Sequence, residues 1–84
     1  MLRRKPDLDE IVEAVRVFRR TNPHMGPTFA EIGKHVSPER PFPRSTIHYY
    51  VTRLLEAGRL EATFAEGKMV SRSLRLPPPN GADT

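Results

Sequence analysis

The stretch RSTIHYYVTRLLEAG, residues 44–58, decides the fold because it carries two very different faces. Apolar side chains recur at the i, i+3, i+4 and i+7 spacing that lines one side of a helix: Ile47, Tyr50, Val51, Leu54 and Leu55. The other side carries hydrogen-bonding and cationic side chains, and its only acid, Glu56, comes in the last turn. We expect a helix with Ser45 as its N-cap and Gly58 as its stop, and with the apolar side buried.

An earlier helix is predicted over residues 7–20. Asp7 is a good N-cap, and Glu10 stands three residues later, as in a capping box. The apolar stripe of this helix comprises Leu8, Ile11, Val12, Val15 and Phe18. Acids occupy its first turns and three arginines its last (Arg16, Arg19 and Arg20), which suits the helix dipole. This charge pattern therefore indicates good helix design and surface solubility, and it does not predict a binding site.

A short middle helix is predicted to begin after Thr28, with Glu31 completing a second capping box. Its buried side comprises Phe29, Ile32 and Val36. Gly33 in its middle lowers helix propensity by about 1 kcal/mol relative to alanine, so we expect another helix to pack closely there. The proline-rich loop SPERPFP, residues 37–43, follows, and we expect Phe42 to fold back onto the core.

The hydrophobic period changes from helical to alternating after residue 58. Apolar residues alternate with polar ones over 59–64 and again over 69–76, and AEGK (65–68) supplies a turn between them. This pattern predicts a β-hairpin, and a hairpin alone is marginal in water. We expect four of its side chains to lie against the helices: Leu60, Phe64, Leu74 and Leu76.

The predicted order of three helices followed by a hairpin is an α+β winged helix-turn-helix. The chain has 84 residues, enough for one domain, which we place at 7–76. We expect residues 1–6 to be a flexible basic arm. The proline-rich segment 77–84 contains too little apolar material to fold, so we expect a flexible tail there.

Charge favours an acidic partner. The formal net charge is +4, and residues 44–76 hold six basic and three acidic residues, a net of +3. The chain has no cysteine, which excludes disulfides and thiolate metal sites, and the three histidines lack partners at ligand spacing. No apolar run approaches the roughly 20 residues needed to span a bilayer. We therefore expect a cytoplasmic, nucleoid-associated protein without cofactor, metal or evident small-molecule ligand.

The predicted layout gives the polar face of 44–58 a purpose, because a winged helix places its last helix in the DNA major groove and its wing on the backbone. A helix there must keep carboxylates away from phosphates and offer hydrogen-bonding groups to base edges. The residues we expect to read bases are Arg44, Ser45, Thr46, His48 and Tyr49. Those we expect to contact the DNA backbone are Thr28, Thr52, Arg53, Lys68 and Arg72.

Three segments carry a resemblance to a known family: GPTFAEIGKHV (26–36), STIHYYVTRLLEAGRLE (45–61) and SRSLRL (71–76). Together they resemble the N-terminal DNA-binding domain of the LexA repressor family. The resemblance implies a winged helix and places Ser45, Thr46 and His48, together with Tyr49, at base-reading positions. The loop 37–43 is proline-rich and longer than the family's. The sequence also has no counterpart of the family's protease-like domain or its Ser/Lys dyad, so we do not expect a self-cleaving repressor.

Two functions from different classes remain open at this point. The first is a sequence-specific double-stranded DNA-binding protein acting in transcription regulation, as a homodimer or beside a partner protein. The second is a winged-helix protein-interaction module, since a face rich in tyrosine and arginine also resembles an interface hot spot. We do not expect an enzyme, because no nucleophile–base pair, carboxylate pair or phosphate-cradling glycine loop is present.

Overall fold

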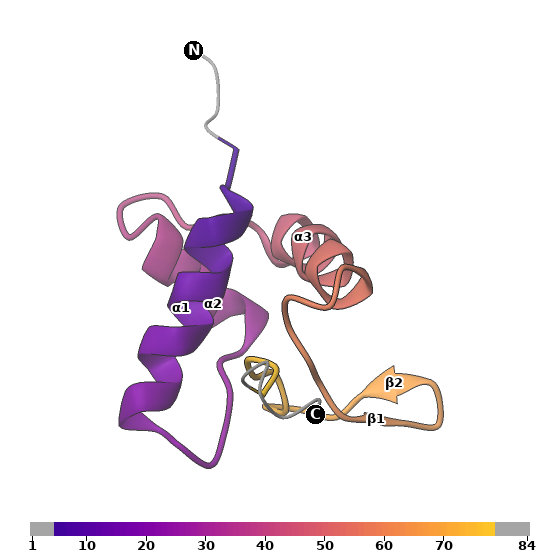
Figure 1. The fold of residues 1–84 in the computed structure, drawn as a ribbon. Helices are drawn as coiled ribbons and strands as arrows, with labels where there is room; N and C mark the ends of the chain where they lie inside the picture. Colours follow the sequence, from indigo (N-terminus) through magenta and orange to yellow (C-terminus); the bar gives the residue numbers. More distant parts are fainter. Residues whose placement is uncertain (1–4, 79–84) are drawn as a thin grey trace.

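The computed structural model describes residues 5–78, which form three helices followed by a short antiparallel hairpin (Figure 1). The elements are α1 (Leu8–Thr21), α2 (Phe29–Val36), α3 (Arg44–Glu56), β1 (Phe64–Ala65) and β2 (Lys68–Met69). This is a winged-helix-like α+β arrangement, so the predicted fold class is confirmed. Most of the predicted arm (1–4) and most of the predicted tail (79–84) lie outside the described residues.

Both predicted capping boxes are present. At α1, the backbone N–H of Asp7 donates to Glu10 Oε1 at 3.2 Å, and the Asp7 side chain accepts from the first turn. At α2, Thr28 N donates to Glu31 Oε1 at 2.8 Å, and Glu31 N donates to Thr28 Oγ1 at 3.1 Å. Each satisfies donors that a helix start leaves unpaired, and an N-cap contributes about 1 kcal/mol. Two of the three helix starts are therefore fixed by local sequence.

The start of α3 differs from the prediction. Its N-cap is Pro43, with no side-chain capping bond, and Ser45 lies inside the first turn. The backbone of Pro43 is extended (φ −61°, ψ 153°), while its carbonyl already accepts from Ile47 N at 3.2 Å. The proline-stiffened loop holds this conformation, so the helix begins directly after it. The predicted stop is confirmed, since Gly58 has a φ of +77° and the helix ends at Glu56.

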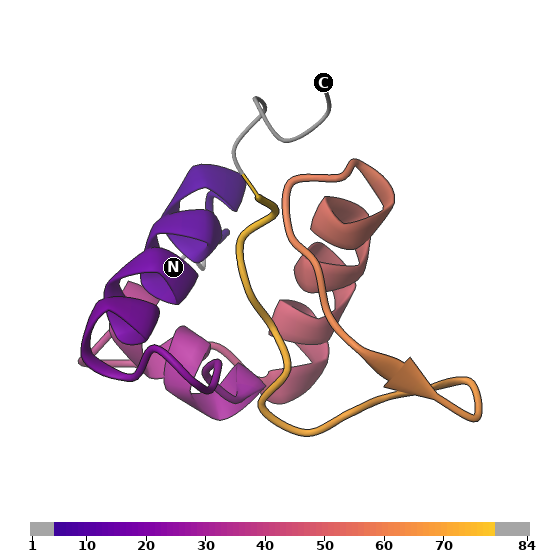
Figure 2. The ribbon, with the colours of Figure 1, turned by 60° about the horizontal axis from the view of Figure 1, so that its bottom comes forward.

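A single hydrophobic core joins all three helices to the segments on either side of the hairpin. The buried hydrophobic residues are Ile11, Val12, Ala14, Val15, Ile32, Phe42, Ile47, Val51, Leu54, Leu60 and Leu74. Phe42 folds back onto this core as predicted, and Tyr50 packs against it partly buried. Figure 2 shows the last described segment passing between α1 and the residues that follow α3, where Leu74 is 1% exposed.

The hairpin is shorter and less regular than the alternation predicts. Only Phe64–Ala65 and Lys68–Met69 pair as strands, and Glu61 and Arg75 form a separate antiparallel bridge. Between the two paired regions the second arm makes an extra turn, closed by the bond from Ser73 N to Val70 O at 3.2 Å. The second arm therefore bulges away from the first.

The outer part of the hairpin leaves two large apolar side chains exposed, and one of them, Phe64, was expected to lie against the helices. Phe64 is 55% exposed and does not pack on the helices, and Val70 is 39% exposed. Leu60 and Leu74 are buried as expected, and Leu76 packs against the core partly buried. The part of the hairpin near the helices belongs to the core, whereas the outer part, here called the wing (residues 63–70), projects from it (Figure 2).

Gly33 is required by close packing: the Ile47 side chain of α3 lies beside it as expected, but its tightest neighbour is the loop before that helix. A Cβ at this position would lie 2.7 Å from the carbonyl oxygen of Phe42, in the loop before α3. Such a contact with backbone forces the loop to move. The close approach between α2 and this loop therefore depends on glycine.

We predict that Gly33→Ala lowers the free energy of unfolding by about 1 kcal/mol, because overpacking of about 1–3 kcal/mol exceeds the helix-propensity gain of about 1 kcal/mol. Thermal and urea unfolding followed by circular dichroism would measure the change. Lys34→Ala, at an exposed position of the same helix, is the control and should change stability little. A Gly33→Ala variant more stable than the wild type would show that the loop yields freely.

Candidate nucleic-acid interface

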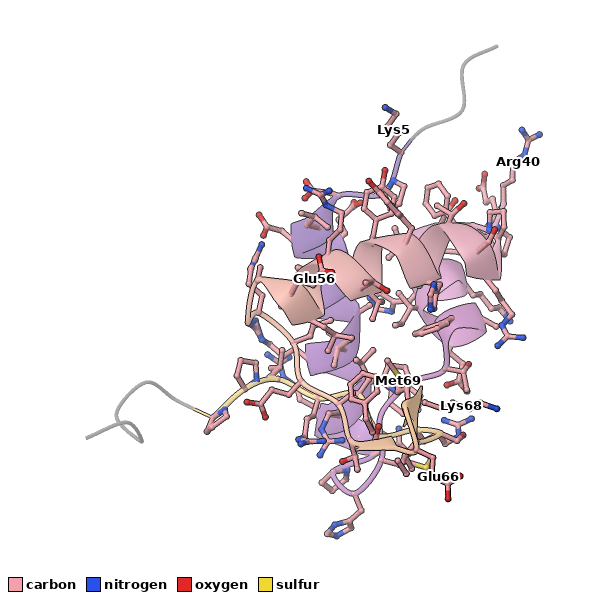
Figure 3. All side chains as sticks on the ribbon, turned by 90° about the vertical axis from the view of Figure 1, so that its right-hand side faces the viewer. Lys5, Arg40, Glu56, Glu66, Lys68 and Met69 are labelled. Atoms are coloured by element: carbon pink, nitrogen blue, oxygen red, sulfur yellow. The ribbon has the colours of Figure 1, made fainter. Side chains whose placement is uncertain are left out.

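α3 and the wing both lie toward the viewer in Figure 3, and Arg44 and His48 of α3 line one groove with residues of the wing. Arg44, Ser45, His48 and Tyr49 are all exposed on α3, and their spacing keeps them on adjoining stripes of one helix face. Thr46 is half-buried and lies off this face. The structure therefore brings four of the five predicted base-reading residues onto one exposed surface.

An open groove separates the start of α3 from the wing and the start of α2. It has a volume of about 290 Å³ and is lined by Pro27, Thr28, Phe29, Arg44, His48, Met69, Val70, Ser71 and Arg72. Four of the lining residues belong to the predicted site, although they come from three separate stretches of the chain. The groove is thus built by the tertiary fold and not by any one motif.

His48 is held at the edge of this groove by an aromatic neighbour. Its ring meets the ring of Phe29 edge-on, with centroids 5.5 Å apart. Such a contact restrains the imidazole without using either ring nitrogen. Both nitrogens remain free to hydrogen-bond a partner in the groove, a role that the sequence alone could not distinguish from simple exposure.

Tyr49 and Arg53 form a pair on the outermost part of α3. The Arg53 guanidinium lies over the Tyr49 ring, 5.8 Å from its centroid, and its Nη1 donates to the Tyr49 hydroxyl at 3.4 Å. Tyr49 remains 55% exposed and also meets Tyr50 edge-on. The pair therefore presents a partly ordered cationic and aromatic surface to whatever approaches α3.

Two of the residues expected to contact the DNA backbone, Thr52 and Arg72, use their hydrogen-bond donors within the protein. The hydroxyl of Thr52 donates to the carbonyl of His48 at 2.8 Å, so it offers a phosphate only an acceptor. Arg72 lies in the bulge with a φ of +57° and not in the second strand, which corrects its expected placement. Its guanidinium donates to both carboxylate oxygens of Glu31, at 3.0 Å each, and to Gly26 O at 3.3 Å.

The tip of the wing carries an acid that the sequence-based site omits. Glu66 and Gly67 form the turn, both with positive φ (55° and 80°), and Lys68 follows at the start of β2. The side chains of Glu66 and Lys68 leave this tip in different directions (Figure 3). The charge of Lys68 is therefore opposed by Glu66 at the same tip, and the wing is less basic than Lys68 alone suggests.

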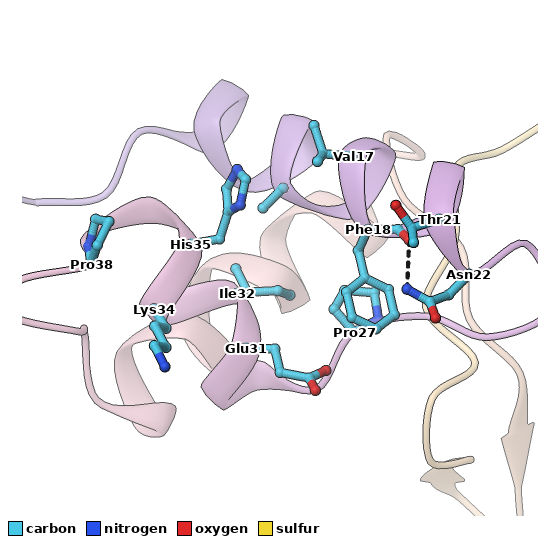
Figure 4. A pocket seen from close by; sticks show the side chains of 11 residues that line it. Val17, Phe18, Thr21, Asn22, Pro27, Glu31, Ile32, Lys34, His35 and Pro38 are labelled. Atoms are coloured by element: carbon cyan, nitrogen blue, oxygen red, sulfur yellow. Dashed lines mark hydrogen bonds between the residues drawn. The ribbon is translucent and has the colours of Figure 1, made fainter.

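A second groove, between α1 and α2, contains none of the predicted site residues. Its volume is about 500 Å³, and its lining includes apolar side chains from both helices, among them Val17, Phe18 and Ile32 (Figure 4). At one end Asn22 Nδ2 donates to the Phe18 carbonyl at 3.1 Å. Lys34 lies at its rim (Figure 4) and gives a cation outside the candidate interface.

Neither a protein-family model, nor a curated protein, nor a solved structure matches the chain. The LexA resemblance accordingly stays a prediction that rests on the three quoted segments.

Two further kinds of site bear on function, a metal centre and a membrane span, and both concern residues 5–78. Within that range no three His, Asp or Glu side chains gather as metal ligands. No helix in the same part of the chain has the length and apolar character needed to cross a bilayer.

We predict an acid-dependent loss of stability from Glu31. The hydrogen bond from Arg72, with a further bond from Thr28 N–H, lowers the pKa of Glu31 below its ordinary value of 4.5. The folded pKa lies below the unfolded one, so the contribution is complete above about pH 4.5 and is lost as the pH falls below it. Melting temperatures of the wild type and Glu31→Gln from pH 7 to pH 3 should therefore converge at the acid end.

Arg72→Gln should show the same weakened pH dependence, and the Glu31→Gln/Arg72→Gln double variant should weaken it no further. Parallel curves for the wild type and Glu31→Gln would contradict the assignment.

Proposed function

We propose that this chain binds double-stranded DNA sequence-specifically as a transcriptional regulator, with α3 in the major groove and the wing along the backbone. The observation that carries the proposal is the exposed, acid-free start of α3 lying beside the wing across an open groove. The major groove of B-DNA is about 12 Å wide and admits one helix, whose N-terminal residues reach the base edges. Met69 and Val70 of the wing line the open groove beside α3, which supports a wing that lies along the flanking backbone.

The exposed residues of α3 suit base readout. Arg44 lies in the first turn, where a guanidinium can donate twice to a guanine edge. Ser45 is free of any capping role because Pro43 occupies the N-cap. His48 and Tyr49 add one ring each, the first facing the groove and the second facing outward.

Contacts to phosphate fall to fewer residues than the sequence suggests. Arg53 and Lys68 are exposed cations, and we assign them to the backbone. Thr28 lies at the start of α2 in the same groove, where a helix N-terminus favours an anion, although its hydroxyl already accepts from Glu31 N. Arg72 and Thr52 are left out of this set because their donors are engaged within the protein.

We predict that Arg53→Gln and Lys68→Gln weaken binding to all duplexes alike, each lowering the slope of log affinity against log salt by about one. His48→Ala and Tyr49→Ala should instead reduce discrimination at particular base pairs, by about 1–3 kcal/mol each. Selection from a random duplex library, followed by fluorescence anisotropy at salt concentrations of about 50–200 mM, would measure both effects.

Lys34→Gln, at the rim of the α1–α2 groove, is the matched charge control and should leave affinity nearly unchanged. Equal losses on selected and random DNA for all four interface variants would overturn base reading. Absence of DNA binding at low salt would favour the protein-interaction alternative, for which the exposed Tyr49–Arg53 pair is the specific observation.

We further predict that Glu66→Gln tightens DNA binding, because it removes a carboxylate from the wing tip beside Lys68. The gain should be largest at low salt and shrink as salt rises, since exposed charges are screened. Anisotropy titrations against one duplex would measure it, with the exposed α1 variant Glu13→Gln as control. Unchanged or weaker binding by Glu66→Gln would show that the tip does not approach the DNA backbone.

A further inference from the structure

Arg72 connects the base of the wing to the beginning of α2. Its guanidinium makes a two-pronged ion pair with Glu31, with Nη1–Oε1 and Nη2–Oε2 both at 3.0 Å. Its backbone carbonyl accepts from Gly26 N at 2.8 Å, and its Nη1 donates back to Gly26 O at 3.3 Å. One residue of the bulge is thus bonded through both its side chain and its main chain to elements far away in sequence.

Glu31, the acid of this ion pair, also caps α2. Glu31 Oε1 also accepts from Thr28 N at 2.8 Å and so closes the capping box of α2. The Phe18 ring of α1 lies 5.9 Å from the Arg72 guanidinium carbon and covers it from another side. Arg72 is therefore held by α1, by the start of α2 and by the loop between them.

The backbone of Arg72 has a conformation that is unfavourable for a residue with a side chain. A φ of +57° is left-handed and costs a non-glycine residue about 1–2 kcal/mol. The neighbouring turn is tied to the first arm by Ser73, whose Oγ accepts from Thr63 N at 3.0 Å and donates to Val70 O at 2.7 Å. Bonds from both sides therefore keep the bulge in place at the base of the wing.

The wing itself has little to hold its direction. Its strands are two residues each, and a two-stranded hairpin is marginally stable alone. It projects from the helices in Figure 1 and Figure 2, so its direction must be set where it joins them.

We propose that Arg72 is a positioning residue whose ion pair with Glu31 fixes the direction in which the wing leaves the helices, and hence where Lys68 lies relative to α3. The consequence for DNA binding rests on the proposed function, whereas the effect on the wing does not. This role differs from that of a phosphate ligand, in which the guanidinium would have to leave Glu31.

The first test measures wing direction without DNA. The chain has no cysteine, so spin labels can be placed through Ala65→Cys on the wing and Glu56→Cys at the end of α3, both exposed positions. Pulsed electron–electron spin resonance should give a narrow distance distribution in the parent. Adding Arg72→Gln or Glu31→Gln should broaden or shift it, and Arg72→Lys should have an intermediate effect because a lysine cannot make the two-pronged pair.

Arg16→Gln is the matched control, since Arg16 makes a comparable ion pair with Glu13, at 3.0 Å, within α1. It should leave the distance distribution unchanged. Circular dichroism would verify that each variant is folded, and Glu31→Gln keeps an acceptor for the α2 cap in case Arg72→Gln unfolds. An unchanged distribution in folded Glu31→Gln would overturn the positioning role.

The second test uses the sign of the Glu31→Gln effect on DNA affinity in the unlabelled protein. A positioning role predicts severalfold weaker binding with the salt slope retained. A phosphate-ligand role predicts the opposite, because losing the carboxylate frees a cation and raises both affinity and slope. A wild type that binds no DNA would overturn the proposed function alone, since the spin-label distances still decide the positioning role.

Discussion

The burial of one side of α3 is the constraint on which the rest of the structure depends. Ile47, Val51 and Leu54 are at most 1% exposed and anchor the helix against α1 and α2. Because successive helical residues advance by a fixed angle, burying this side commits Ser45 and Tyr49 to the opposite, open side. The exposed polar face therefore follows from core packing, and no separate interaction is needed to present it.

Local chemistry predicts much of this fold. The two capping boxes, the core side of each helix and the stop at Gly58 involve residues within a few positions of one another, and the structure has all of them. The start of α3 was predicted wrongly because Ser45 is a good cap in isolation, whereas the loop holds Pro43 extended two residues earlier. At this helix start, the conformation of the preceding loop outweighs the capping propensity of serine.

Long-range bonds account for what the sequence could not predict. Apolar and polar residues do alternate over 69–76, but this pattern does not predict the bulge. The bulge is held by a bond between Glu31 and Arg72, which stand 41 positions apart. The exposed face of α3 was predictable from periodicity. The engagement of Thr52 by its own helix was not predictable, because a pattern of residue types does not say which donors are already used.

The sharing of Glu31 between two structures bears on how the molecule opens. Freeing the wing base would break the ion pair and remove bonds at Gly26, while leaving the cap of α2 with a carboxylate that has lost its counter-charge. The start of α2 and the base of the wing should then loosen together as one cooperative unit. Their amide hydrogens would exchange with solvent at a common free energy, separate from the short strands beyond, whose opening leaves this joint intact.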